Sequence, residues 1–381
     1  MILPKFDLAL YVLLAFAFFL GISDAAANFI LILGIIYVFI RSLKVPIKMS
    51  CPKGLVISLV AFCSSVAIAG VWAEHSAESS RAGFTLILNI LPMFLPLLLL
   101  SDKKQVPWAV LALGGSVCLN SAYAFYQIVM KLPVTGYTND VDFLTTSLLI
   151  GIAIIITTFD KFDFSKSQQK GLLGISVLSA VVLFLLGNVS TLLGLTMIGL
   201  LYALLNYQEK TKGLAGLVVA IVSGGTAFLN FTTNFDFVQK LLLWDEASKI
   251  FHNNQLIGIG HSQFNVIING LNFTNAESNI LNFLVEGGII GLVGFAVLFG
   301  YIIFYFGKKY LQDKSYLLSS TIIVATMAII VEGLFKYNVY EPIVMRQYWF
   351  VLGLIIVLNQ LNNKFQDSSN NKSNKKMKRK N

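Results

Sequence analysis

The feature that most constrains the fold is a series of apolar windows separated by short polar breaks. A helix of about 20 residues spans the apolar core of a bilayer, because each residue adds about 1.5 Å to its length. We count about twelve windows of this kind, the first at Phe6–Ile22 and the last at Ile343–Leu358. Only 12% of the residues are charged, compared with about 25% in soluble domains. The sequence therefore predicts an all-α, polytopic integral membrane protein.

The basic residues indicate the orientation of the chain in the membrane. Cytoplasmic loops retain Lys and Arg, and with both termini in the cytoplasm most of the 28 basic residues fall in such loops. The exceptions are Arg81, Lys131, Lys240, Lys249, Lys336 and Arg346. This alternation requires the N-terminal apolar stretch to be retained as a helix, although Lys5 and the run "DAAAN" are also typical of a signal peptide.

Four parts can be distinguished along the chain. Residues 1–231 hold most of the predicted membrane helices, and residues 277–360 hold the remaining ones. Between them, residues 232–276 form one large extracytoplasmic loop. Residues 361–381 form a basic cytoplasmic tail, which we expect to contact anionic lipid headgroups rather than nucleic acid.

The large loop contains the segment "NFDFVQKLLLWDEASKIFHNN", in which apolar residues recur at three-and-four spacing. The recurring residues are Phe237, Leu241, Trp244, Ala247, Ser248 and Phe251. This spacing predicts an amphipathic helix lying at the membrane surface. Long loops in compact folds are usually functional, although a passive cap over the bundle would explain this one as well.

Polar residues are concentrated in the outward halves of the predicted helices. They are Asn89, Asn120, Tyr123, Gln127, Asn188, Asn279, Asn282, Glu286, Glu332 and Arg346. The inward halves hold little beyond Ser, Thr and Cys. A transporter needs polar partners along its whole path, with sites near the midplane of the membrane. Polarity that stops partway favours an enzyme acting at the outer leaflet.

The segment "AESNILNFLVEGGIIG" begins a predicted membrane helix with two carboxylates. On a regular helix, Glu277 would share one stripe with Gly288 and Gly291. A second stripe would comprise Asn275, Asn279, Asn282 and Glu286. We expect the glycines of this segment to allow close approach of a neighbouring helix. Glu277 could alternatively serve only as an N-terminal cap together with Ser278.

Together with "LIGIGHSQF", this segment resembles the signature of the family of O-antigen polymerases and O-antigen ligases. These are bacterial membrane glycosyltransferases that act on glycans linked to undecaprenyl pyrophosphate. Glu277, Ser278, Gly288 and Gly291 match the spacing of the family. The resemblance implies a GT-C-like helical bundle in the bacterial cytoplasmic membrane, an active site facing the periplasm, and no cofactor. Glu277 stands where ligases carry His, which favours a polymerase, and an Arg that often precedes the Gly-x-Gly segment is absent.

The resemblance also implies a mechanism, in which a hydroxyl of one lipid-linked repeat unit attacks the anomeric carbon of a growing chain. Undecaprenyl pyrophosphate then leaves. We expect Glu277 and Arg346 to be catalytic, Glu277 as the base and Arg346 as a bidentate partner of the leaving pyrophosphate. The expected substrate-binding residues are Arg81, Lys240, Lys249, His261, Asn279, Asn282, Glu286 and Glu332.

Some of these residues have simpler explanations. Arg346 could form an ion pair with Glu341 or Glu332, and Arg81 could pair with Glu78. Asp140 and Asp142 have the Asp-x-Asp spacing that some glycosyltransferases use for a divalent metal. A helix cap also explains them, and the scattered histidines lack the spacing of metal ligands. We therefore expect no metal site.

Polymerisation of lipid-linked repeat units is thus the first functional hypothesis. Its partners would be the lipid-linked glycan, membrane lipids, a chain-length regulator and a flippase. Ligation of finished glycan to an acceptor would use the same parts. A transporter or lipid-linked oligosaccharide flippase predicts two related halves, and we see no internal repeat. A structural membrane scaffold is the remaining alternative.

Overall fold

The computed structural model describes residues 7–43, 51–138, 140–233, 236–312 and 318–377, with only the backbone at 236–237 and 363–377. The predicted orientation also rests on residues that lie outside the described ones: Lys5, Lys44, Lys48, Lys314, Lys378, Arg379 and Lys380. The helices are α1 (Leu8–Phe19), α2 (Asp24–Ser42), α3 (Lys53–Trp72), α4 (Ser76–Leu88), α5 (Phe94–Leu99), α6 (Val106–Val129), α7 (Val141–Thr158), α8 (Lys166–Leu186), α9 (Val189–Leu205), α10 (Lys210–Thr233), α11 (Asp236–Asn253), α12 (Asn279–Gln312), α13 (Ser319–Glu332) and α14 (Pro342–Met377).

The predicted fold class is confirmed. Within the described chain, nine helical segments are long and apolar enough to cross a membrane. Three shorter apolar helices, α1, α9 and α13, account for the remaining apolar windows of the sequence. The only strands among the described residues are β1 (Val266–Ile268) and β2 (Leu271–Phe273), which form an antiparallel hairpin. The chain is an all-α, polytopic membrane protein.

Short polar residues fix where several helices begin. The Asn188 side chain accepts a hydrogen bond from the Ser190 amide at 3.1 Å and so caps α9. Asp140 caps α7 in the same way through the Asp142 amide, at 2.6 Å. The cap interpretation of Asp140 is therefore confirmed. These caps place the starts of α7 and α9 beside the polar side chains described below.

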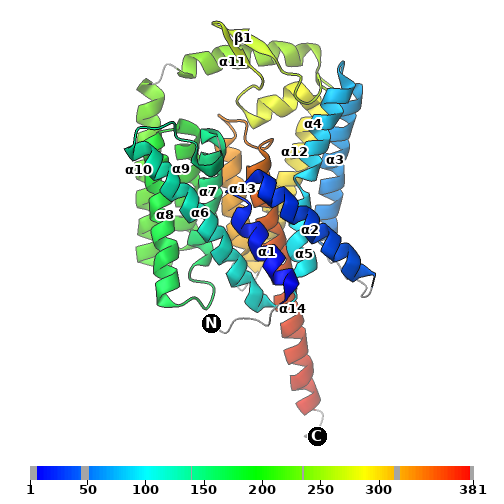
Figure 1. Ribbon diagram of the computed structural model, residues 1–381, viewed down its shortest axis with the longest axis vertical. Coiled ribbons are helices and arrows are strands. Elements are labelled where there is room, and N and C mark those ends of the chain that lie inside the picture. The colour runs from blue at the N-terminus through cyan, green and yellow to red at the C-terminus, as the bar shows by residue number, and fades with distance from the viewer. Residues whose placement is uncertain (1–6, 44–50, 139, 234–235, 313–317, 378–381) are drawn as a thin grey trace.

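Helix α11 lies across one end of the bundle, with the hairpin beside it (Figure 1). We call this the capped end. The predicted helix of the large loop is confirmed, whereas its place at a membrane surface stays a prediction. Its buried side shares Ala247 with the expected stripe but is shifted away from Leu241 and Ser248. Leu243 and Ala247 are fully buried, whereas Leu241 is 47% exposed and Ser248 is exposed. The difference arises because α11 packs on Phe264, Ile268 and Val285, which contact the Leu243 side of the helix.

Helix α14 is the most deeply buried of the membrane-spanning helices. The side chains from Val344 to Leu358 are buried throughout, and Figure 1 shows the helix continuing as a single extension beyond the bundle, at the end away from α11. Arg346 lies on this buried helix. A charge in such a place is stable only when it is paired and hydrogen-bonded.

Buried polar residues toward the opposite end are mostly Ser and Thr. The hydroxyls of Thr157, Thr158, Ser176 and Thr326 each donate to the backbone carbonyl four residues earlier in their own helix. Thr157 and Thr326 also bond to a neighbouring helix, at Thr321 (2.9 Å) and Tyr348 (2.8 Å). Several longer polar side chains bond between elements nearer the capped end, as described below.

Candidate active site

Helix α12 is kinked at Gly288, so the stripe expected from a regular helix is wrong. Gly288 has φ 62° and ψ −162°, a conformation that essentially only glycine adopts. Glu277 precedes the first residue of the helix, Asn279, and does not share a helical face with Gly288. A periodicity argument assumes regular helical geometry, which the kink removes.

The Gly-x-Gly segment fills the gap that the kink opens in the backbone ladder of α12. The Ile289 amide donates to the Gln255 carbonyl at 2.8 Å, and the Ile290 amide donates to the Leu256 carbonyl at 3.2 Å. In the other direction, the Ile259 amide donates to the Val285 carbonyl at 2.9 Å. These bonds satisfy backbone groups that the break would leave unpaired inside the protein.

This loop, rather than a helix, approaches the kink closely. A Cβ on Gly258 would lie 2.5 Å from the Glu286 carbonyl oxygen, and the φ of Gly258 is +78°. A Cβ on Gly287 would have no neighbour within 4 Å. A helix does pack closely at Gly294, against Ser65 of α3. The expectation that Gly287, Gly288 and Gly291 receive a neighbouring helix is therefore wrong.

Glu277 lies at the capped end, directly before α12, with its side chain 36% exposed. Its Oε2 forms an ion pair with Lys240 Nζ of α11 at 2.9 Å. The Lys240 ammonium also donates to the Phe335 carbonyl at 2.7 Å. Within the described residues, the Glu277 carboxylate makes this ion pair and does not cap α12. Glu277 has φ +47°, a left-handed conformation that is uncommon for a residue with a side chain.

Trp244 stabilises the same junction from α11. Its indole N–H donates to the Ala276 carbonyl at 3.1 Å, and its ring lies 5.7 Å from the ring of Phe335. Together with Lys240, Trp244 fixes α11 to the residue before Glu277 and to the connection between α13 and α14. The Glu277 carboxylate is thus held by Lys240, and the backbone before it is held by Trp244.

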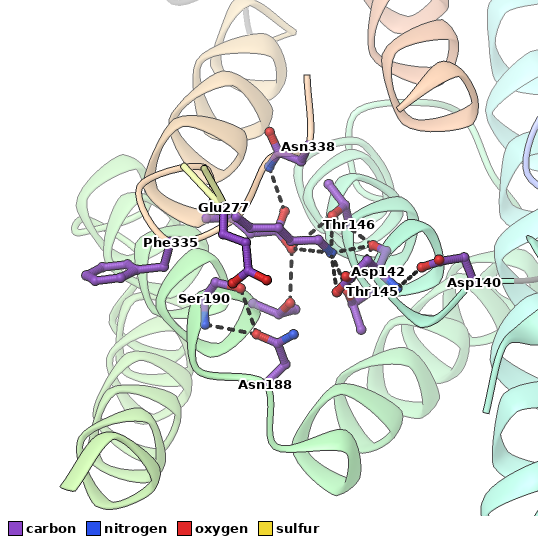
Figure 2. Close-up of polar contacts among 12 residues, drawn as sticks. Asp140, Asp142, Thr145, Thr146, Asn188, Ser190, Glu277, Phe335 and Asn338 are labelled. Carbon is purple, nitrogen blue, oxygen red and sulfur yellow. Dashed lines mark hydrogen bonds and ion pairs between the residues drawn. The ribbon is translucent and has the colours of Figure 1, made fainter. Parts of the chain in front are cut away.

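A second polar cluster lies below this junction, around Glu332 and Lys336. Glu332 is fully buried and accepts hydrogen bonds from Thr146 (2.9 Å), Thr191 (3.0 Å) and Asn338 (3.1 Å). Lys336 is 6% exposed, and its Nζ lies 3.6 Å from Glu332. Figure 2 shows Thr145, Thr146, Asp142 and Asn338 converging on this cluster.

Asn279 ties the start of α12 to the connection that follows α13. Its side-chain amide donates to Asn338 Oδ1 at 2.7 Å, and its Oδ1 accepts from the Asn338 amide at 3.1 Å. The Asn279 amide donates to the Gly333 carbonyl at 2.7 Å. Asn279 is 2% exposed, so its side chain is directed at these protein contacts and away from solvent. Asn282 is buried as well, and its Oδ1 accepts from the Ala276 amide at 2.6 Å.

Glu286 and His261 form a third cluster, where the Gly-x-Gly loop meets α12. Both are 1% exposed, and His261 Nδ1 lies 3.6 Å from Glu286 Oε2. The Val66 carbonyl can only accept, so His261 Nε2 carries the proton in their 3.2 Å bond. Nδ1 is then free to accept from the Tyr340 hydroxyl, its other neighbour.

The tyrosines around this cluster stay protonated. The Tyr337 hydroxyl donates to Glu286 Oε2 at 3.3 Å. Burial and the nearby Glu286 carboxylate raise the pKa of Tyr337 and of Tyr340 well above the usual value for tyrosine. Each hydroxyl therefore acts as a donor. The cluster holds the Gly-x-Gly loop to α12 and to the connection before α14.

Arg346 pairs with neither of the carboxylates expected from the sequence. Its Nη1 forms an ion pair with Asp24 at the start of α2, and its Nε donates to Asn89 Oδ1 at 3.0 Å. The predicted pairing with Glu341 or Glu332 is wrong. Asp24 is 322 positions away in the sequence, so local spacing could not reveal it.

The remaining expected residues lie at the surface. Arg81 is exposed on α4, and no ion pair with Glu78 is present among the described residues. Lys249 is 60% exposed on α11 and pairs with Asp245 and Glu246, each at 2.7 Å. Neither contacts Glu277. Among the described residues, no group of three or more His, Cys, Asp and Glu side chains could hold a metal ion.

Lys336 and Glu341, in the connection between α13 and α14, had no predicted role in the site. Lys336 counted only toward membrane orientation, although its spacing of four from Glu332 was a usable signal. Glu341 directly precedes α14. Burial, together with the Asp140 carboxylate, raises the pKa of Glu341 to about 8. Both residues lie in the short connection that also carries Phe335 and Asn338.

Comparison with known proteins agrees with the sequence signature. A family model described as O-antigen ligase matches residues 174–296. This range includes α11, the Gly-x-Gly loop, Glu277 and the kink of α12. No curated protein matches the chain. The resemblance to the family of O-antigen polymerases and O-antigen ligases is thereby confirmed over residues 174–296.

Proposed function

We propose that the protein polymerises oligosaccharide repeat units linked to undecaprenyl pyrophosphate into O-antigen or capsular polysaccharide. The observation that carries this proposal is the partly exposed Glu277 carboxylate, held 2.9 Å from Lys240 at the capped end. The family match supports glycan transfer of the O-antigen ligase and polymerase type. Glu277 stands at the position where, by the resemblance, a ligase has His.

Glu277 has the geometry of a general base. Lys240 contacts Oε2 and orients the carboxylate, while Oε1 has no hydrogen-bond partner among the described residues. Oε1 could therefore accept the proton of the attacking hydroxyl as the new glycosidic bond forms. The bond between the anomeric carbon and the pyrophosphate breaks in the same step, and the pyrophosphate leaves with the bonding electrons.

Charge develops on the pyrophosphate as it leaves, and cations stabilise it. Lys240 lies 2.9 Å from the proposed base, and we assign it this role. We assign Arg81, which is exposed on α4, a supporting part in this role. The Nη1 and Nε of Arg346 already bond to Asp24 and Asn89, so a role for Arg346 at the leaving group stays a prediction.

The proposal includes an orientation. The capped end would face the periplasm and both termini the cytoplasm of a bacterial cell. The lipid-linked glycan would then reach Glu277 from the outer leaflet, after a flippase has delivered it, and a chain-length regulator would limit the product. No metal or cofactor is required by the proton transfer to Glu277.

The test is the glycan made by a strain whose own gene is replaced by the Glu277→Gln variant. We expect single repeat units attached at the surface, because the variant lacks the base. Glu246→Gln is the matched control, since Glu246 also pairs with a lysine of α11, Lys249, but belongs to α11 itself and not to the start of α12. Wild-type chain lengths in the Glu277→Gln strain would refute the proposal.

Ligation is the second candidate, because the matching family model is described as O-antigen ligase. The same strain separates the two activities. Loss of a ligase leaves finished polymer on its lipid carrier and unattached at the surface. Loss of a flippase exports no glycan at all.

A further inference from the structure

We propose that Lys336, together with Glu332, is a positioning residue that sets where the Glu277–Lys240 pair lies. This inference rests on the function proposed above. It also changes the role of Glu332, which the sequence suggested as a substrate-binding residue. Glu332 is fully buried, and its carboxylate is occupied by Thr146, Thr191, Asn338 and Lys336.

The Lys336 ammonium joins helices that are far apart in sequence. It donates to Thr145 Oγ1 at 2.9 Å and to Thr146 Oγ1 at 3.0 Å, and it lies 3.2 Å from Asp142 Oδ1. The Asp142 carbonyl also accepts from it. Through these contacts and the Glu332 carboxylate, one cation connects α7, α9 and the end of α13.

The peptide segment on either side of Lys336 supports the candidate base. Phe335 supplies the carbonyl that accepts from Lys240 at 2.7 Å. Gly333 and Asn338 hold Asn279, which is two residues after Glu277. Glu332 holds Asn338 in turn, at 3.1 Å. Both members of the Glu277–Lys240 pair therefore depend on the segment that Lys336 anchors.

The anchor is sensitive to a single substitution because its charges are buried. Removing Lys336 alone leaves the Glu332 carboxylate without its cation in a site that water does not reach, and the surrounding segment must rearrange. A shift of about 1 Å at a reacting group can lower the rate on the order of 10²-fold. Lys336 itself is only 6% exposed, so it would act through position and not through substrate contact.

Hydrogen exchange of the purified full-length protein tests the positioning directly. In Lys336→Met we expect amide exchange to rise about tenfold in residues 333–339 and also in 276–282, across the Asn279 contact. Lys212→Met is the matched control, because Lys212 is also ion-paired, with Asp160 and Glu209, but lies at the start of α10, away from the capped end. A rise confined to 333–339, or one spread equally over all helices, would overturn the proposal.

Kinetics give the second readout, with lipid-linked repeat units extracted from a deletion strain as the probe. We expect kcat of Lys336→Met to fall on the order of 10²-fold while KM changes little. If Lys336 acts through Lys240, the Lys240→Met/Lys336→Met variant should lose no more than Lys240→Met alone. Additive losses, or a change confined to KM, would contradict the positioning role.

A milder variant covers the case in which Lys336→Met fails to fold. Thr145→Val removes one hydroxyl partner of the ammonium and keeps the volume and both charges, so we expect the same changes at a smaller size. Wild-type exchange at 276–282 in Thr145→Val, with wild-type kcat, would count against the proposal. A wild-type protein that transfers no glycan would refute the proposed function, and the exchange experiment would still decide the positioning.

Discussion

Replacement of Gly288 by Ala should destabilise the protein strongly, because the kink of α12 depends on this glycine. Its φ of 62° and ψ of −162° lie in a region that costs a residue with a side chain about 1 to 3 kcal/mol. A Cβ would also press against the Leu256 carbonyl and lie 2.5 Å from the Ile257 nitrogen. Both neighbours are backbone atoms, so the Gly-x-Gly loop would have to move as a unit.

That movement also breaks backbone hydrogen bonds, and their loss adds to the cost of the strained backbone. The bonds at risk join Ile289 to Gln255 and Ile290 to Leu256, and each contributes about 1 kcal/mol. The total cost is then about 3 to 5 kcal/mol. This is a large part of the roughly 5 to 15 kcal/mol by which a folded protein is typically stable.

The assay is thermal unfolding of the purified variants in detergent, with Gly287→Ala as the control. Gly287 has no neighbour within 4 Å of a built Cβ and no positive φ, so its replacement should leave the melting midpoint unchanged or slightly higher. Gly288→Ala should melt many degrees lower. Equal midpoints for Gly288→Ala and the wild type would refute the role assigned to the kink.

Two further substitutions test the buried charges. Asp24→Asn should lower the free energy of unfolding by about 3 kcal/mol, because it leaves the buried Arg346 guanidinium without its carboxylate. Arg346→Met should cost less, since the carboxylate it leaves unpaired, Asp24, is 45% exposed to water. A larger loss in Arg346→Met would contradict the pairing. The raised pKa of Glu341 makes the folded state bind its proton more tightly than the unfolded chain, so its contribution to stability should fall as pH rises from about 4.5 to about 8. Melting midpoints measured against pH should show this slope in the wild type and its loss in Glu341→Gln.

Much of the fold follows from local sequence patterns. Apolar windows revealed the membrane helices, and three-and-four spacing revealed α11, because both depend on properties of consecutive residues. The buried side of α11 was less predictable. It depends on Phe264 and Val285, which reach it only through the folding of the loop and the kink.

The site was harder to foresee, because its contacts join distant parts of the chain. Glu277 could be singled out from the signature, yet Lys240 could be recognised as its partner only once α11 was placed over α12. The cluster around Lys336 depends on Thr145, which is 191 positions away. The kink at Gly288 was hidden for a different reason, since glycine is frequent in membrane helices and the kink depends on backbone bonds to Gln255 and Leu256.

Sided labelling of position 277 tests the central claim most directly, namely that the carboxylate faces the outside of the cell. Glu277→Cys would be made in a chain whose Cys51, Cys63 and Cys118 are replaced, with Asp163→Cys as the marker for the opposite end. A membrane-impermeant maleimide added to spheroplasts should label position 277 and leave position 163 unlabelled. Labelling of position 277 only after the cytoplasmic side is opened would contradict the claim.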